Sequence, residues 1–120
     1  MTVILYNSDE TESTNDTNTW QTKLSTSGKT RNTPHKIFVS CEYTGNATNK
    51  ISEIRVLIDG IERSYDYQIP QVSNNYKKFC DFGEITFPTE TTHTLELQFR
   101  SGTLPQITKI RRARINIEQH

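Results

Sequence analysis

The sequence predicts an all-β fold, a single jelly-roll-type antiparallel β-sandwich of about eight strands. The composition is the first reason, because eighteen threonines and only two alanines favour strands over helices. The second reason is that short runs of alternating apolar and polar residues are separated by turn residues. The length of 120 residues suffices for one compact domain and is too small for two.

The N-terminal part combines a short apolar run at residues 3–6 with an acidic segment at residues 7–18. The acidic segment holds four acidic residues, no basic residue and no large apolar one, so we expect an exposed loop or arm. The apolar run is either an edge strand of its own domain or a strand lent to a neighbouring subunit. We therefore divide the chain into an N-terminal strand with an acidic arm, 1–18, and a β-sandwich domain, 19–120.

Two strands are predicted between residues 20 and 43. The first begins at Trp20 and alternates through Leu24, and Gly28 and Pro34 then break the pattern. The second, at residues 35–43, shows the clearest alternation of the chain. Its inward side chains are expected to be Ile37, Val39, Cys41 and Tyr43.

A hairpin is predicted around Asp59-Gly60, because this dipeptide is a strong tight-turn signal between two strand-like runs. The strand before the turn directs Ile54, Val56 and Ile58 inward. The strand after it, residues 61–69, is expected to return antiparallel beside the first. Its large side chains are Ile61, Tyr65, Tyr67 and Ile69.

Three further strands are expected towards the C-terminus, at residues 76–87, 94–99 and 113–117. In the first of them Cys80 and Phe82 have one parity and Ile85 and Phe87 the other. A β-bulge at Gly83 would bring them onto one buried face. The last two strands alternate regularly.

Charge and motifs weigh against several function classes. Fourteen Lys and Arg balance fourteen Asp and Glu, so we expect neither a nucleic-acid nor a membrane partner. No residue pattern indicates a catalytic, cofactor-binding or metal site, and Asp81-Phe82-Gly83 lacks the other motifs of a protein kinase. Cys41 and Cys80 are expected to be free thiols, although a bridge between them stays possible.

Four segments, TWQTKL at 19–24, IRVLIDG at 54–60, TLELQFRSG at 94–102 and IRRARI at 110–115, follow one another in a familiar order. Together they resemble small jelly-roll domains in virion proteins of tailed bacteriophages, over about residues 19–118. The resemblance implies a β-sandwich, often trimeric, that serves as a capsid decoration (cement) protein, a head fibre or a tail module. The acidic segment 7–18 has no counterpart in it.

A subunit interface is predicted from charge and from two apolar residues. Residues 100–114 carry five basic and no acidic side chains, whereas residues 1–18 carry four acids and no base, so the two segments are complementary between subunits. Solvated faces at opposite ends of the molecule are the alternative. Leu57 and Ile110 have outward parity, as an interface would require. The predicted interface residues are Val3, Leu5, Leu57, Ile110, Arg111, Arg112 and Arg114.

The leading expectation is a non-enzymatic viral structural protein, a homotrimer on the exterior of a bacteriophage capsid that is synthesised in the host cytoplasm. Its partners would be its own copies and the major capsid protein or another virion protein, and it would stabilise the particle by binding only the assembled shell. The main alternative is a receptor- or carbohydrate-binding module of a phage tail or fibre. Its candidate aromatic residues are Trp20, Tyr65, Tyr67 and Tyr76, three of which fall on faces predicted to be buried.

Overall fold

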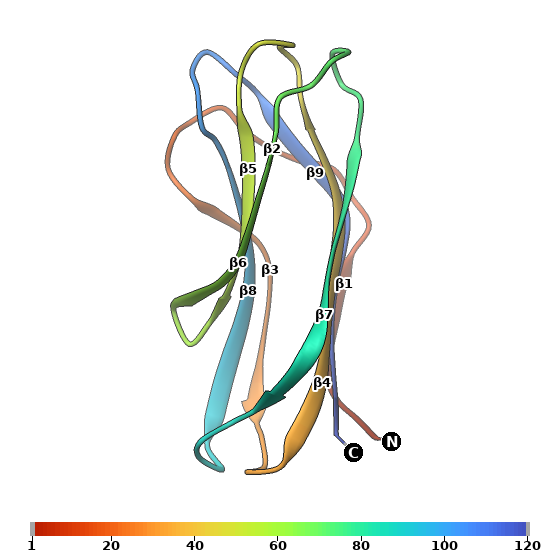
Figure 1. The fold of residues 1–120 in the computed structure, drawn as a ribbon, viewed down its shortest axis with the longest axis vertical. Helices are drawn as coiled ribbons and strands as arrows, with labels where there is room; N and C mark the ends of the chain where they lie inside the picture. The colour runs from red at the N-terminus through yellow and green to blue at the C-terminus, as the bar shows by residue number, and fades with distance from the viewer. Residues whose placement is uncertain (1, 120) are drawn as a thin grey trace.

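The computed structural model describes residues 2–119, with side chains from Leu5 to Gln119. Within this range the chain forms nine strands in two antiparallel sheets that pack face to face (Figure 1), which confirms the predicted all-β sandwich. The strands are β1 (Thr2–Asp9), β2 (Ser13–Asn15), β3 (Gln21–Lys29), β4 (Pro34–Gly45), β5 (Ser52–Ile58), β6 (Ile61–Gln68), β7 (Lys77–Thr86), β8 (Thr92–Ser101) and β9 (Thr108–Gln119).

The strand order is that of a jelly roll. The five-stranded sheet has the order β1-β9-β4-β7, with β2 paired to β9, and the four-stranded sheet has the order β3-β8-β5-β6. Most connections cross from one sheet to the other, so the neighbours of a strand usually come from distant parts of the sequence. The two ends of the chain lie at the same end of the sandwich (Figure 1).

The hydrophobic core lies between the two sheets and is built from the inward side chains of five strands together with Phe87. The alternation predicted for residues 35–43 is confirmed, because Ile37, Val39, Cys41 and Tyr43 are all buried. The inward placement of Ile54 and Val56 is likewise confirmed. The core cluster contains Leu24, Ile37, Val39, Cys41, Tyr43, Ile54, Val56, Phe87, Leu95, Leu97, Phe99, Ile110, Ala113, Ile115 and Ile117.

The hairpin at Asp59-Gly60 is confirmed. Ile58 pairs with Ile61, which leaves a two-residue loop, and both loop residues have positive φ, 52° at Asp59 and 80° at Gly60. This is the backbone of a type I′ turn, which Asp-Gly adopts readily because glycine carries no Cβ. The tight turn fixes β6 as the antiparallel edge neighbour of β5.

The N-terminal run is an edge strand of its own domain, since β1 pairs with β9 of the same chain. The sequence predicted an exposed loop or arm for the acidic segment, but part of this segment is paired and buried. Residues 13–15 form β2 against β9, and the side chain of Asn15 is 5% exposed and donates to the carbonyl oxygens of Thr19 and Phe99. A short polar side chain with backbone acceptors within reach is buried at little cost, which the absence of large apolar residues does not reveal.

The predicted bulge at Gly83 is wrong. The pairing of β4 with β7 runs without a shift from Pro34↔Thr86 to Tyr43↔Lys77. Cys80 and Phe82 therefore point away from the core, and Phe82 is 66% exposed. The two parities of this strand correspond to the two faces of an ordinary strand.

A bulge occurs instead in β9. Arg111 pairs with Glu42 and Arg114 pairs with Ser40, so Arg112 and Ala113 both lie opposite one residue of β4. Arg112 has a φ of 51°, as the first residue of such a bulge can have. The extra residue reverses the parity of the strand, which turns Ile110 into the core with no exposed surface. The expectation that Ile110 faces outward is therefore wrong.

Leu57 does face outward, but it is covered. It pairs with Glu62 of β6 and with Glu96 of β8, and it lies outside the core cluster. Only 7% of its surface is exposed. The expectation that Leu57 offers an exposed apolar contact is wrong, because parity predicts the face of a sheet and not how far neighbouring side chains cover it.

Candidate functional site

The outer face of the four-stranded sheet brings aromatic and charged side chains together in two rows. One row joins Arg100 of β8, Glu53 of β5 and Tyr67 of β6, because Glu53 pairs with both of the others. Residues that lie directly opposite one another in a sheet project from the same face. The row therefore presents a cation, an anion and an aromatic ring side by side.

The second row lies beside the first. Thr22 of β3 pairs with Gln98 of β8, Gln98 with Arg55 of β5, and Arg55 with Tyr65 of β6. Strand alternation places this row on the same face as the first, since its members are two residues away along β5, β6 and β8. The two rows together span the whole width of the sheet.

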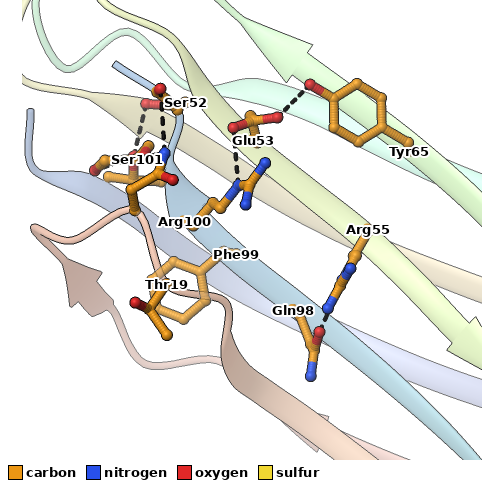
Figure 2. A network of polar contacts seen from close by, with 12 residues as sticks. Thr19, Ser52, Glu53, Arg55, Tyr65, Gln98, Phe99, Arg100 and Ser101 are labelled. Atoms are coloured by element: carbon orange, nitrogen blue, oxygen red, sulfur yellow. Dashed lines mark hydrogen bonds and ion pairs between the residues drawn. The ribbon is translucent and has the colours of Figure 1, made fainter. Parts of the chain in front are cut away.

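Hydrogen bonds fix the polar side chains of both rows (Figure 2). Glu53 accepts from Arg100 Nε at 3.0 Å and from the hydroxyl of Tyr65, which links the two rows. Arg55 Nε donates to Gln98 Oε1 at 2.8 Å. The Glu53 side chain is 8% exposed, so its ion pair with Arg100 is held away from bulk water. Side chains that are already bonded to one another lose little freedom when a ligand binds.

Trp20 lies at the β3 edge of this face. The Cζ atoms of Arg55 and Arg100 are each 4.3 Å from the centroid of its ring, so two guanidinium groups pack on the indole. Guanidinium groups at this distance are attracted by the ring quadrupole. The ring is half-buried, and the two contacts connect it to both rows.

Tyr65 and Tyr67 lie at the opposite, β6 edge. Their ring centroids are 6.4 Å apart with an interplanar angle of 32°, and the residues are 45% and 53% exposed. Burial of its hydroxyl end, together with the hydrogen bond to Glu53, raises the pKa of Tyr65. Its hydroxyl therefore stays protonated and keeps donating to the carboxylate at neutral pH.

Tyr76, the fourth aromatic candidate, lies apart from these three. It precedes β7 in the five-stranded sheet, its hydroxyl donates to Glu12, and Arg111 lies 3.6 Å from its ring centroid. Burial and the bond to Glu12 raise its pKa to about 12. The structure thus unites Trp20, Tyr65 and Tyr67 on one face and separates Tyr76. The expectation that three of the four are buried is wrong, since none of them is.

The residues predicted as an interface make contacts within the chain. Arg111 and Arg112 both pair with Glu42, at 2.9 and 3.2 Å, and Arg114 pairs with Glu10 at 2.9 Å. Of these arginines, Arg114 pairs with the acidic segment of its own chain, whereas Arg111 and Arg112 pair with Glu42 of β4. Leu5 packs against the core, and the side chain of Val3 lies outside the described part of the chain.

Among residues 2–119, no group of three or more His, Cys, Asp or Glu side chains is arranged to hold a metal ion. Over the same range, no helix has the length and apolar character needed to cross a membrane.

Sequence reasoning singled out the aromatic residues and missed their polar neighbours, Glu53, Arg55, Gln98 and Arg100. Glu53, Arg55 and Gln98 have outward parity on predicted strands, which is the ordinary place for a solvated side chain, and Arg100 directly follows the predicted strand 94–99. Their grouping depends on β8 lying between β3 and β5. Outward parity is the local property that these residues share, and it does not distinguish a binding face from an ordinary solvated one.

No protein-family model and no curated protein sequence matches the chain, but solved structures do. The EclA C-terminal domain, described as a sugar-binding protein, matches with a TM-score of 0.56 and 12% identity, over 88% of this chain and 77% of that one. The CBM36-1 domain of a multidomain xylanase from the hindgut metagenome of Trinervitermes trinervoides matches with a TM-score of 0.53 and 12% identity, over 92% and 95% of the two chains.

Dimeric latent PorU from Porphyromonas gingivalis matches with a TM-score of 0.50 and 12% identity, over 98% of this chain and 13% of that one. None of these three structures is described as a virion protein. At such low identity the likeness shows the fold alone. The chain is a jelly-roll-like β-sandwich.

Proposed function

We propose that the chain is a non-enzymatic carbohydrate-binding module and that the outer face of the four-stranded sheet is its binding surface. The observation that carries the proposal is the exposed pair Tyr65 and Tyr67, which lies beside hydrogen-bonded polar groups. Neighbouring aromatic rings left in solvent next to convergent polar groups are typical of a binding surface.

The chemistry of this face suits a sugar. A pyranose ring has a C–H face that packs on an aromatic ring, and hydroxyl groups around its edge that need donors and acceptors. Tyr65 and Tyr67 supply the rings, and Gln98 and the guanidinium groups of Arg55 and Arg100 supply polar atoms that are fixed in place. Two of the similar structures, a sugar-binding protein and a module of a xylanase, support the proposal.

The bacteriophage decoration function, the homotrimer and the capsid-exterior location stay predictions. Arg111, Arg112 and Arg114, which were expected to contact another subunit, form ion pairs within one chain, and Leu57 and Ile110 are buried. The carbohydrate-binding function was the alternative at the level of the sequence, and the grouping of its aromatic candidates now favours it.

Binding is tested with the purified protein and a panel of soluble polysaccharides in affinity electrophoresis, followed by isothermal titration calorimetry. Tyr65→Ala and Tyr67→Ala are each expected to weaken binding about two- to tenfold, because an aromatic contact contributes roughly 0.5–1.5 kcal/mol. Tyr76→Ala is the matched control, since it removes a tyrosine on the other sheet and is expected to bind normally. The single tryptophan, Trp20, lies on the face and provides a fluorescence signal for binding.

Two results would count against the proposal. One is a folded protein that binds none of the polysaccharides on the panel or on a glycan array. The other is binding that Tyr76→Ala abolishes while Tyr65→Ala and Tyr67→Ala leave it intact, which would move the site to the five-stranded sheet.

A further inference from the structure

Arg55 differs from the other arginines on strands. Each of those forms an ion pair with a carboxylate of this chain, whereas Arg55 pairs with none among residues 2–119. Its one hydrogen-bond partner in that range is the neutral Gln98. The paired strand arginines are Arg63, Arg100, Arg111, Arg112 and Arg114.

The guanidinium group of Arg55 is nevertheless held in place. Its Nε donates to Gln98 Oε1 at 2.8 Å, and its Cζ lies 4.3 Å from the ring centroid of Trp20. Gln98 is itself fixed, because its Nε2 donates to Thr22 Oγ1 and to Glu96 Oε2, both at 3.2 Å. A guanidinium carries five N–H donors, and the bond to Gln98 uses only one of them.

We infer that the outer face of the four-stranded sheet binds an acidic saccharide, whose ring packs on Tyr65 and whose carboxylate or sulfate group binds Arg55. The inference rests on the proposed function. Arg55 and Tyr65 are directly opposed on β5 and β6, so a ring and a cation are offered side by side. The planar fork of arginine matches carboxylate and sulfate oxygens, which form shorter and stronger hydrogen bonds than neutral hydroxyls do.

The acidic side chains on this face are Glu53, Glu62 and Glu96. Glu53 accepts from Arg100 and Tyr65, and Glu96 accepts from Thr22 and Gln98, so both carboxylates are engaged by donors of the protein. Glu62 lies opposite Leu57, in the row beyond Arg55. Of the two arginines on this face, Arg100 is paired with Glu53, and only Arg55 has no carboxylate partner among residues 2–119. Lys29, a further cation of this face, lies opposite Thr92, six residues along β8 from Gln98.

The test compares each acidic polymer with its neutral counterpart. Polygalacturonate is compared with its carboxyl-reduced form, and dextran sulfate with dextran, so that the two arms separate carboxylate from sulfate as the bound group. The wild-type protein is expected to bind at least one acidic polymer about tenfold more tightly than the neutral counterpart, with an affinity that falls as salt is added. Equal binding of both members of each pair would overturn the inference and leave the proposed function standing.

Arg55→Gln is the decisive variant, because glutamine keeps a donor near Gln98 and removes the charge. We expect it to lose most of the preference for the acidic polymer, and Arg55→Lys to retain part of it. Arg114→Gln is the matched control, since it makes the same change in net charge on the other sheet. Its binding should be unchanged, and equal losses in Arg55→Gln and Arg114→Gln would reveal a nonspecific charge effect and overturn the inference.

Thermal unfolding shows whether these variants fold. If Arg55→Gln does not fold, the preference of Arg55→Lys for the acidic polymer over the neutral one decides the question. Failure of every polysaccharide to bind the folded wild-type protein would overturn the proposed function together with the inference. Tyr65→Ala separates the two further. It should weaken binding of both members of a polymer pair, whereas Arg55→Gln should affect the acidic member only.

Discussion

His93 and Asp59 form a hydrogen-bonded ion pair that joins the β5–β6 turn to the beginning of β8. His93 Nδ1 lies 2.6 Å from Asp59 Oδ2, and His93 Nε2 lies 3.0 Å from the carbonyl oxygen of Thr89. Both partners are acceptors, so both ring nitrogens are suited to carry a proton. The backbone amide of Thr94 donates to the other oxygen of Asp59 at 2.9 Å. The pair therefore fits an imidazolium and a carboxylate.

This pair predicts a pH range of greatest stability. The hydrogen bonds to Asp59 and Thr89 raise the pKa of His93 above 6.5, so its contribution is complete below 6.5 and is lost as the pH rises through the folded-state value. Burial opposes ionisation of Asp59, but the bonds from His93 and Thr94 outweigh it and hold its pKa below 3.8. The contribution of Asp59 is complete above 3.8 and is lost as the pH falls.

The measurement is the free energy of unfolding by urea between about pH 4 and 9, in the wild type and in His93→Gln. The wild type should lose stability above pH 6.5, and His93→Gln should lose the slope along with about 1–3 kcal/mol at pH 5.5. Asp59→Asn is the control for the turn, since asparagine tolerates the positive φ at this position. A wild-type slope that survives in His93→Gln would assign the pH dependence to another group.

Lys23 provides a second prediction, because its side chain is fully buried yet charged. Its Nζ donates to Asp9 Oδ2, to the Thr11 carbonyl and to Ser13 Oγ at 3.1, 2.7 and 2.9 Å. Lys23→Met is expected to cost about 2 kcal/mol, since it leaves these acceptors without their donor. Hydrogen exchange of residues 9–15 should accelerate. Lys29→Met, at the exposed end of the same strand, should change neither quantity, and unchanged exchange in Lys23→Met would show that other contacts hold the segment.

The local features of the fold were predictable from the sequence. The Asp59-Gly60 turn and the alternation at residues 35–43 depend on a few neighbouring residues, whose conformations and parities follow from their own chemistry. The strand order is not of this kind. Nothing near Arg55 indicates that β8 will lie beside it, so the rows on the outer face of the four-stranded sheet could not be derived before the topology was known.

Two expectations from the sequence differ from the structure, and each difference has one physical cause. Ile110 was placed outward because arginine is a poor signal for a bulge, which more often uses a glycine at positive φ. The segments rich in acidic and in basic residues were assigned to different subunits because charge composition does not reveal distance. The register of β1 and β2 on β9 brings them together in one chain.

The bulge in β9 gives a third prediction. A side chain at the φ of 51° found at Arg112 is strained, by about 1–2 kcal/mol for residues other than glycine. Arg112→Gly relieves this strain and loses an ion pair whose arginine is 58% exposed, so we expect the stability to be unchanged or slightly higher. Arg112→Val should be destabilising by more than about 1 kcal/mol, because a β-branched residue rarely adopts this conformation. The measurement is the free energy of unfolding by urea. If Arg112→Val is as stable as Arg112→Gly or more stable, β9 shifts its register instead of keeping the bulge.

The two thiols give the last prediction. Cys41 lies in the core on β4 and Cys80 is exposed on the neighbouring β7, and both are free. They face opposite sides of the sheet, since Cys80 pairs with Ser40 and Cys41 pairs with Phe79, so no bridge forms between them. Burial raises the pKa of Cys41, which keeps its thiol protonated and unreactive.

Titration with a chromogenic disulfide reagent should therefore modify one thiol per chain in the native protein at pH 8 and both thiols in denaturant. Cys80→Ser should abolish the native reaction and leave the denatured one at a single thiol. Rapid modification of Cys41 in native Cys80→Ser would mean that β4 and β7 separate, because its sulfur is reached only when the sandwich opens at that edge.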